Sequence, residues 1–99
     1  MTISTTFSTG RKADVNASAV QMTSSTVKAE HGVLVRAGAG NTGKIYVGNS
    51  SAVTANSADA TDGFPLAAGE SVVVKVRIAD GIYLIADGAN NDDIWWMLV

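Results

Sequence analysis

The chain has 99 residues, a length that predicts one domain with a thin core. Its formal net charge is −2 with 16% charged residues, and no apolar run reaches the roughly 20 residues that span a bilayer, so we expect no nucleic-acid and no membrane partner. The lack of cysteine excludes disulfides and thiolate metal sites.

Residues 1–14 are polar and rich in serine and threonine, with Phe7 as their one aromatic side chain. Such a composition predicts a flexible N-terminal arm, and residues 15–99 then form the single folded domain. The arm could become ordered on a neighbouring subunit, where Arg11 and Lys12 would meet an acidic surface. A plain disordered terminus is the alternative.

The pattern over residues 15–26 is weak. Alternation of small and apolar side chains favours a short strand near residues 19–23. A helix over residues 13–22 is the competing interpretation, because alanine and glutamine favour helices.

From residue 32 onwards the alternation of apolar and polar side chains becomes clear. Residues 32–37 predict a strand, a glycine-rich turn follows at 38–43, and residues 44–48 predict the next strand. The Asn-Thr-Gly sequence in that turn favours a hairpin between the two strands. Residues 49–62 read as a long loop with room for a short strand at 52–54.

The stretch 63–86 has the best pattern in the chain. After a proline-containing turn, four apolar residues fall on one side of an extended chain, namely Val72, Val74, Val76 and Ile78. A turn at 80–81 leads to a strand that begins at 82–85. A turn-rich loop at 87–93 then precedes a strand over residues 94–99.

Seven or eight short strands joined by turns predict an all-β, compact antiparallel β-sandwich or a small barrel. Several apolar side chains lie opposite the main apolar set: Leu34, Val73, Tyr83, Ile85 and Trp95. One sandwich has one interior, so we expect copies of the chain, or a partner, to cover some of these side chains.

The glycines of residues 38–44 match most of two phosphate-binding patterns, GxGxxG and GxxxxGK[ST]. Both patterns work at the start of a helix, whereas the residues that follow here alternate like a strand. Ile45 also replaces the serine or threonine that would bind magnesium. A glycine-rich hairpin is therefore the better interpretation.

Other polar residues also suggest structure rather than chemistry. The acidic and amide residues at 59–63 and 87–93 lack the order of a calcium loop, and they are common in turns. His31 is the sole histidine, without a nucleophile that the sequence can place beside it, and Glu70 precedes a strand. We expect a protein that is not an enzyme and holds no cofactor or metal.

Trp95 and Trp96 are adjacent, so on a strand they face opposite ways. One can enter the core, and the other then lies at a surface or a subunit contact, where aromatic side chains are enriched. A platform that stacks on a sugar is the alternative.

Several short motifs occur in one order along the chain: Gly32-Val33-Leu34-Val35-Arg36-Ala37, Asn41-Thr42-Gly43-Lys44-Ile45-Tyr46-Val47-Gly48, Gly63-Phe64-Pro65-Leu66, Gly69-Glu70-Ser71 and Ile82-Tyr83-Leu84-Ile85-Ala86. With the tryptophan-containing end, this order resembles small virion proteins of tailed bacteriophages and prophages, of the head-decoration or cement type. The resemblance covers about residues 19–99. Two departures are Ala68, where a second proline is usual, and a long loop at 49–62.

The resemblance implies a jelly-roll-like β-sandwich on the outer surface of an icosahedral virion, made in the cytoplasm of the bacterial host. The implied partner is the shell of major capsid protein. Proteins of this type are often homotrimers, and the resemblance implies no catalytic residue. Our candidate contacts with the capsid or a neighbouring subunit are Phe7, Arg11, Lys12, Tyr83, Trp95 and Trp96.

Two alternatives remain open from the sequence. The first is a receptor- or glycan-binding module of a fibre or tip, in which one tryptophan is exposed near polar residues such as Asn90 and Asp92. The second is a structural component of the tail or neck built on the same sandwich.

Overall fold

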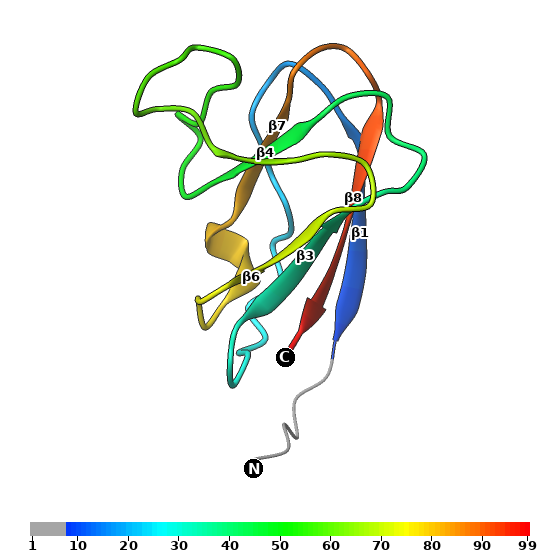
Figure 1. Cartoon of the computed structure of the whole chain (residues 1–99). Coiled ribbons are helices and arrows are strands. Elements are labelled where there is room, and N and C mark those ends of the chain that lie inside the picture. Colours follow the sequence, from blue (N-terminus) through cyan, green and yellow to red (C-terminus); the bar gives the residue numbers. More distant parts are fainter. Residues whose placement is uncertain (1–7) are drawn as a thin grey trace.

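Two four-stranded antiparallel sheets pack face to face in the computed structural model of the chain, which describes residues 8–99 (Figure 1). The first sheet contains, in spatial order, β1 (Thr9–Val15), β8 (Asp92–Leu98), β3 (Val33–Ala37) and β6 (Ser71–Val74). The second contains β2 (Val20–Gln21), β7 (Tyr83–Ala86), β4 (Ile45–Gly48) and β5 (Phe64–Leu66). A 3₁₀ turn, η1 (Ala79–Gly81), precedes β7. The expected all-β class and the expected number of strands are confirmed.

The strands pair in a nested order along the chain. β1 pairs with β8, β2 with β7, β3 with β6, and β4 with β5, all antiparallel. The chain therefore runs out and back like one long hairpin. Two further pairings, β3 with β8 and β4 with β7, complete the two sheets. Within residues 8–99 there is no helix long and apolar enough to cross a membrane.

The core lies between the sheets because alternate side chains of each strand point inward. Val33 and Val35 of β3 and Ile94 of β8 are fully buried from the first sheet, and Ile45 and Leu84 face them from the second. Each such side chain contributes roughly 1.5–3 kcal/mol when it leaves water. The period of two read from the sequence therefore matches the buried face of the structure.

The two adjacent tryptophans do face opposite ways, as predicted. Trp96 is buried and Trp95 is 52% exposed. Gly10 of β1 is paired with Trp96, and a Cβ added at Gly10 would overlap the Trp96 indole. A glycine at this position thus makes room for the largest side chain of the core.

The predicted arm over residues 1–14 is wrong for its second half. Thr9–Val15 form β1, which pairs with β8 from Thr9 opposite Met97 to Val15 opposite Asp92. Backbone hydrogen bonds of a ladder do not depend on side-chain polarity, so a polar segment is ordered once it meets an edge. Residues 1–7, including Phe7, lie outside the described residues.

The predicted hairpin across residues 38–43 is also wrong. β3 and β4 belong to different sheets, so the glycine-rich turn crosses from one sheet to the other. The buried carboxylate of Asp92 directs this crossing, because it accepts hydrogen bonds from the N–H groups of Thr42 and Gly43 at 2.7 and 3.1 Å. The competing helix over 13–22 is replaced by the short strand β2.

Candidate interaction surfaces

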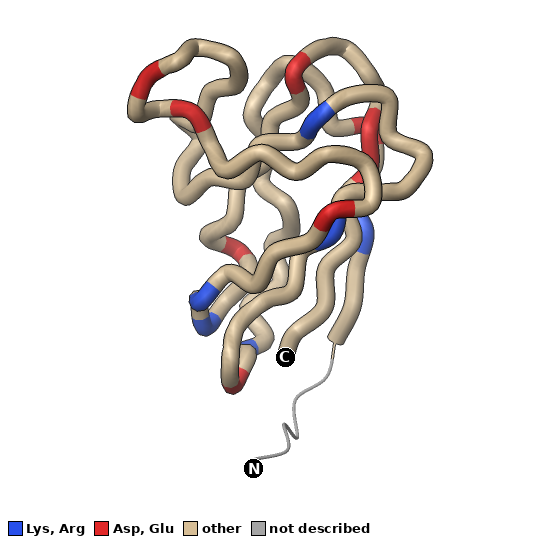
Figure 2. Tube along the Cα trace, in the orientation of Figure 1, with Lys and Arg blue, Asp and Glu red and all other residues tan. Residues whose placement is uncertain are grey.

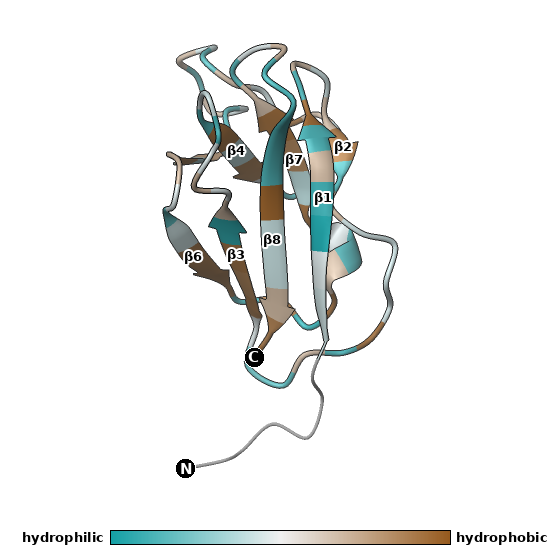
Figure 3. Ribbon diagram, turned by 90° about the vertical axis from the view of Figure 1, so that its right-hand side faces the viewer, coloured by the Kyte–Doolittle hydropathy of each residue, from teal (hydrophilic) through white to brown (hydrophobic). Residues whose placement is uncertain are grey.

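The outer face of the first sheet carries an exposed tryptophan between two arginines. Figure 3 views this sheet with β6, β3, β8 and β1 side by side. Across the strands, Arg11 is paired with Trp95, and Trp95 is paired with Arg36. A second row joins Met97, Leu34 and Val73. We call this surface the tryptophan face, and its residues are Arg11, Leu34, Arg36, Val73, Trp95 and Met97.

One of the two arginines is held by the protein itself. The Arg11 guanidinium donates a hydrogen bond to the Asp93 carboxylate at 2.9 Å, and its Cζ lies 5.4 Å from the centre of the Trp95 ring. A cation at this distance from an indole is attracted by the ring electrons. Arg11 and Asp93 therefore fix one side of Trp95.

The second arginine has no such partner. Arg36 is exposed, and among residues 8–99 no carboxylate forms an ion pair with it. Shallow hollows of about 350 and 280 Å³ lie beside it, and Trp95 lines both. With one aspartate against two guanidinium groups, the centre of the tryptophan face is positive on a chain whose net charge is −2.

The tryptophan face also exposes apolar area. Covering the exposed half of an indole, roughly 100 Å², would contribute about 2.5 kcal/mol. Val73 is 44% exposed, and Leu34 and Met97 are half-buried. The surface presents tryptophan, methionine and arginine together, and these residue types are enriched at protein interfaces.

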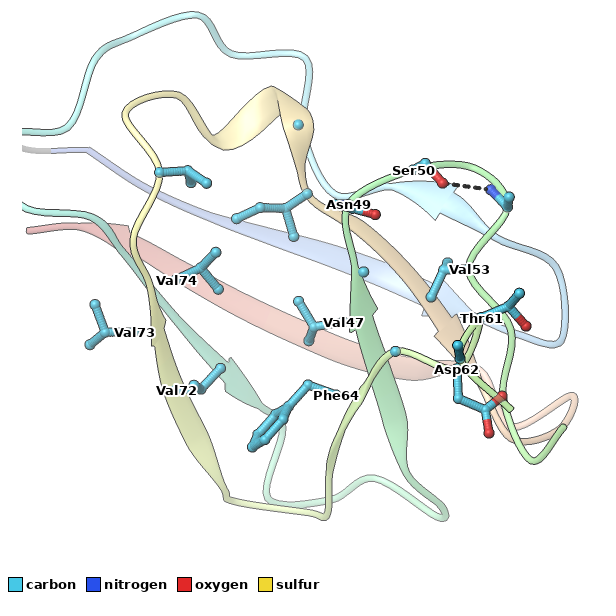
Figure 4. Close-up of a pocket in the computed structure, with 17 residues that line it drawn as sticks. Val47, Asn49, Ser50, Val53, Thr61, Asp62, Phe64, Val72, Val73 and Val74 are labelled. Carbon is cyan, nitrogen blue, oxygen red and sulfur yellow. Dashed lines mark hydrogen bonds between the residues drawn. The ribbon is translucent and has the colours of Figure 1, made fainter. Parts of the chain in front are cut away.

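A second surface is concave and lies where the two sheets part. A cavity of about 530 Å³ opens between β6 and the long loop that follows β4 (Figure 4). Val47, Phe64, Val72 and Val74 point toward this cavity, and Phe64 is 59% exposed. We call it the valine groove, and its apolar lining includes Val47, Phe64, Val72, Val73, Val74 and Val76.

The Asp62 carboxylate ties together one rim of the valine groove. Asp62 accepts hydrogen bonds from the Thr54 hydroxyl at 2.7 Å and from the N–H groups of Ser57 and Ala58 at 3.0 and 2.9 Å. These donors, the Thr54 hydroxyl most of all, hold the pKa of Asp62 below its ordinary value. The prediction that the acidic residues at 59–63 stabilise turns is confirmed for Asp62, which bonds to nearby backbone N–H groups.

The structure gathers some of the candidate contact residues and separates others. Arg11 and Trp95 meet on the tryptophan face, and Trp96 lies behind it in the core. Lys12 is paired with the buried Ile94, so it points to the other side of β1 and is half-buried. Tyr83 lies in β7 of the second sheet.

Four residues of the tryptophan face were not among our candidates: Leu34, Arg36, Val73 and Met97. The alternation in residues 32–37 does place Leu34 and Arg36 on one side of a strand. Only the pairing of β3 with β8, between distant parts of the chain, shows that this side is the one that carries Trp95.

The other motifs have structural partners. Two N–H groups of the glycine-rich turn, those of Thr42 and Gly43, are bonded to Asp92, and a strand follows the turn. The Glu70 carboxylate accepts a hydrogen bond from the Ala67 N–H at 2.7 Å, as expected of a turn residue. Among residues 8–99, no group of three or more histidine, cysteine, aspartate and glutamate side chains could hold a metal ion.

The chain matches no family model, no curated protein and no solved structure.

Proposed function

We propose that the protein is a non-enzymatic decoration protein that binds the outer face of a bacteriophage capsid through the tryptophan face and stabilises the shell. The observation that carries this proposal is Trp95, half exposed at the centre of a broad sheet and flanked by Arg11 and Arg36. The order of the sequence motifs supports it, because that order resembles head-decoration proteins.

A broad, preformed sheet face suits attachment to a shell of repeated subunits. Binding to a rigid face requires little ordering of side chains, so more of the contact energy remains as affinity. A shell offers many equivalent sites, and several linked weak contacts bind far more tightly than one. The capsid partner we propose is the major capsid protein.

The chemistry of the proposed contact follows from Arg36. An exposed guanidinium without a carboxylate partner among the described residues pairs best with an acidic side chain, in two parallel hydrogen bonds. The proposed site on the capsid therefore presents a carboxylate beside an apolar patch that receives Trp95. Charge pairing of this kind also predicts that attachment weakens as salt is added.

We also propose that the sandwich is a jelly roll. The nested pairing of β1 with β8, β2 with β7, β3 with β6 and β4 with β5 supports this, because it is the order of one long hairpin rolled into two sheets. This architecture agrees with what the sequence resemblance implies.

The test is cosedimentation of the purified protein with capsids of the phage that encodes it, prepared without the protein. We expect the wild-type chain to pellet with the capsids, and Trp95→Ala to weaken binding about ten-fold or more, as for the central residue of an interface. Val27→Ala is the matched control, because Val27 is 46% exposed but lies outside the tryptophan face. Wild-type protein that stays in the supernatant, or equal binding by Trp95→Ala, would contradict the proposal.

Glycan binding is the second candidate, favoured by the exposure of Trp95 and by the two hollows beside it. Its predicted polar neighbours are engaged elsewhere, since Asp92 is buried and Asn90 is bonded to Asp87. A glycan array separates the two functions, because binding that is lost in Trp95→Ala would favour the glycan module. Immunolabelling of intact particles distinguishes head from tail or neck.

A further inference from the structure

We propose that a second copy of this chain docks along the free edge of β6 and closes the valine groove, with the two chains antiparallel about a two-fold axis at Val73. This contact does not rest on the tryptophan-face attachment proposed above. Apart from Val73, which lies at the edge of the tryptophan face, it uses residues outside that face.

β6 is an open edge. It pairs with β3 on one side, and among the described residues no strand pairs with its other side. Natural edge strands are protected by charged residues, proline or a bulge, yet Ser71–Val74 reads SVVV. An edge of this composition readily accepts another strand.

The backbone of β6 shows which residues face outward. The Glu70 carbonyl accepts a hydrogen bond from the Ala37 N–H at 2.9 Å, and the Val74 carbonyl oxygen would lie 2.8 Å from a Cβ added at Gly32. Even positions therefore direct their backbone groups toward β3. Because consecutive residues of a strand alternate, Ser71 and Val73 direct their N–H and C=O groups to the free edge.

This alternation selects the register. When two copies pair antiparallel and their sheets share the same inner and outer faces, inner-face residues lie opposite inner-face residues. Even-numbered residues of β6 therefore lie opposite even-numbered residues, and odd-numbered residues opposite odd-numbered ones. With the axis at Val73, the two Val73 residues exchange backbone hydrogen bonds, and Ser71 lies opposite the end of β6 in the second copy, where the chain turns at Lys75. On the inner face, Val72 lies opposite Val74 of the second copy, so valine meets valine and no like charges are opposed.

The same axis closes the groove. A two-fold axis perpendicular to the first sheet leaves the second sheets of the two copies on the same side of the joined first sheets. The valine groove of each copy therefore faces the groove of the other. The exposed Phe64 side chains then enter a shared apolar space, which removes the largest exposed apolar side chain of the groove from water.

Charge supports a second copy as the occupant. Figure 2 shows acidic positions on the loop after β4, at one end of this open side, and basic positions on the turn after β6, at the other end. These are Asp59 and Asp62 against Lys75 and Arg77. Antiparallel docking brings the acidic end of each copy toward the basic end of the other, which favours the encounter.

An isologous contact of this kind joins two copies, whereas the resemblance noted above implies three. Sedimentation equilibrium therefore measures the stoichiometry directly. We expect the wild-type chain to form a two-copy species whose fraction rises with concentration, and Val73→Lys to raise its dissociation constant about ten-fold or more, because the substitution sets two charges against each other at the axis.

The matched control is Val27→Lys. Val27 is 46% exposed and Val73 is 44% exposed, but Val27 lies in no strand, so the control should associate like the wild type. Circular dichroism checks that each variant keeps its fold. A wild-type chain that is monomeric at every concentration, or an assembly of any size that Val73→Lys leaves intact, overturns the proposal. Equal weakening by Val27→Lys overturns it as well.

A covalent trap provides a second measurement that does not require disruption of the contact. The chain has no cysteine, so Val73→Cys introduces a single thiol. Paired residues of antiparallel strands have Cα atoms about 5.5 Å apart, within the range of a disulfide. Mild oxidation should give a two-chain product on a non-reducing gel for Val73→Cys and not for Val27→Cys. Absence of that product from Val73→Cys, or an equal yield from both variants, contradicts the contact.

Discussion

The tryptophan face and the valine groove are both exposed apolar surfaces, but they differ in what surrounds the apolar atoms. On the tryptophan face, two guanidinium groups flank Trp95, and one of them is paired with Asp93. In the valine groove, an uncharged edge strand lines the cavity. A charged surround selects a partner by its side chains, whereas an open edge selects one by its backbone.

The two surfaces also differ in what supports them. Behind the tryptophan face lie the core and the buried carboxylate of Asp92 at the start of β8. One rim of the groove is an exposed loop tied by Asp62. We therefore expect substitutions behind the tryptophan face to cost much more stability than substitutions in the rim of the valine groove.

Trp96→Ala should have the largest effect. Removing an indole that packs over Gly10 leaves a cavity behind the tryptophan face, and such changes cost about 3–5 kcal/mol in free energy of unfolding. The neighbouring Trp95→Ala is the control, with an expected cost below about 1 kcal/mol because half of its side chain is already in water. Urea denaturation measures both, and equal costs would contradict the assignment of the buried and the exposed ring.

Asp92→Ala should cost about 2–3 kcal/mol, because it leaves the N–H groups of Thr42 and Gly43 without their acceptor. Asp93→Ala removes an adjacent carboxylate whose side chain is partly exposed and bonded to Arg11, so its cost should stay below about 1 kcal/mol. Thermal unfolding of the two variants gives the comparison. A cost for Asp92→Ala as small as that for Asp93→Ala would show that the crossing turn does not depend on Asp92.

The contrast between these neighbours also shows what the sequence could predict. Alternation predicts strands at 32–37 and 94–99, and the structure has them at 33–37 and 92–98, because alternation is a local property that fixes which side of a strand is buried. The hairpin over 38–43 was wrong because the choice of partner strand is not local. Asp92, nearly 50 residues away, redirects that turn, and no pattern within the turn reveals it.

The difference between local pattern and long-range pairing also explains two wrong expectations, one about the order of β1 and one about Arg36. The polar side chains of β1 predict a flexible arm, yet the order of β1 comes from backbone bonds to β8. Arg36 was not a candidate because its place beside Trp95 depends on the pairing of β3 with β8. Composition thus predicts which side chains can make a contact, while long-range pairing decides which of them lie together.

On the groove side, Ala58→Gly should stabilise the protein slightly. Ala58 has a φ of 58°, in the left-handed region that costs a residue with a Cβ roughly 1–2 kcal/mol. Glycine avoids this cost but is more flexible when unfolded, so we expect a net gain of about 0.5 kcal/mol. Ala60→Gly in the same loop is the control and should be neutral or slightly destabilising. Chemical denaturation resolves the two, and a loss for Ala58→Gly would contradict the strained backbone.

Lowering the pH should have the smallest effect on stability, because it loosens only the loop that Asp62 ties. The pKa of Asp62 is lower in the folded protein than the ordinary aspartate value of about 3.9. The ionised carboxylate therefore stabilises the fold above that ordinary value, and this stabilisation is lost as the pH falls through the lower folded pKa. Below that point, the loop should release the N–H groups of Ser57 and Ala58 while the sheets stay folded. Hydrogen exchange of these two amides, corrected for the intrinsic effect of pH, should then accelerate in the wild type. In Asp62→Asn, protection of both amides should be weak at every pH, because an amide accepts less strongly than a carboxylate. If acid unfolds the sheets together with this loop, the rim of the groove is not the weaker of the two supports.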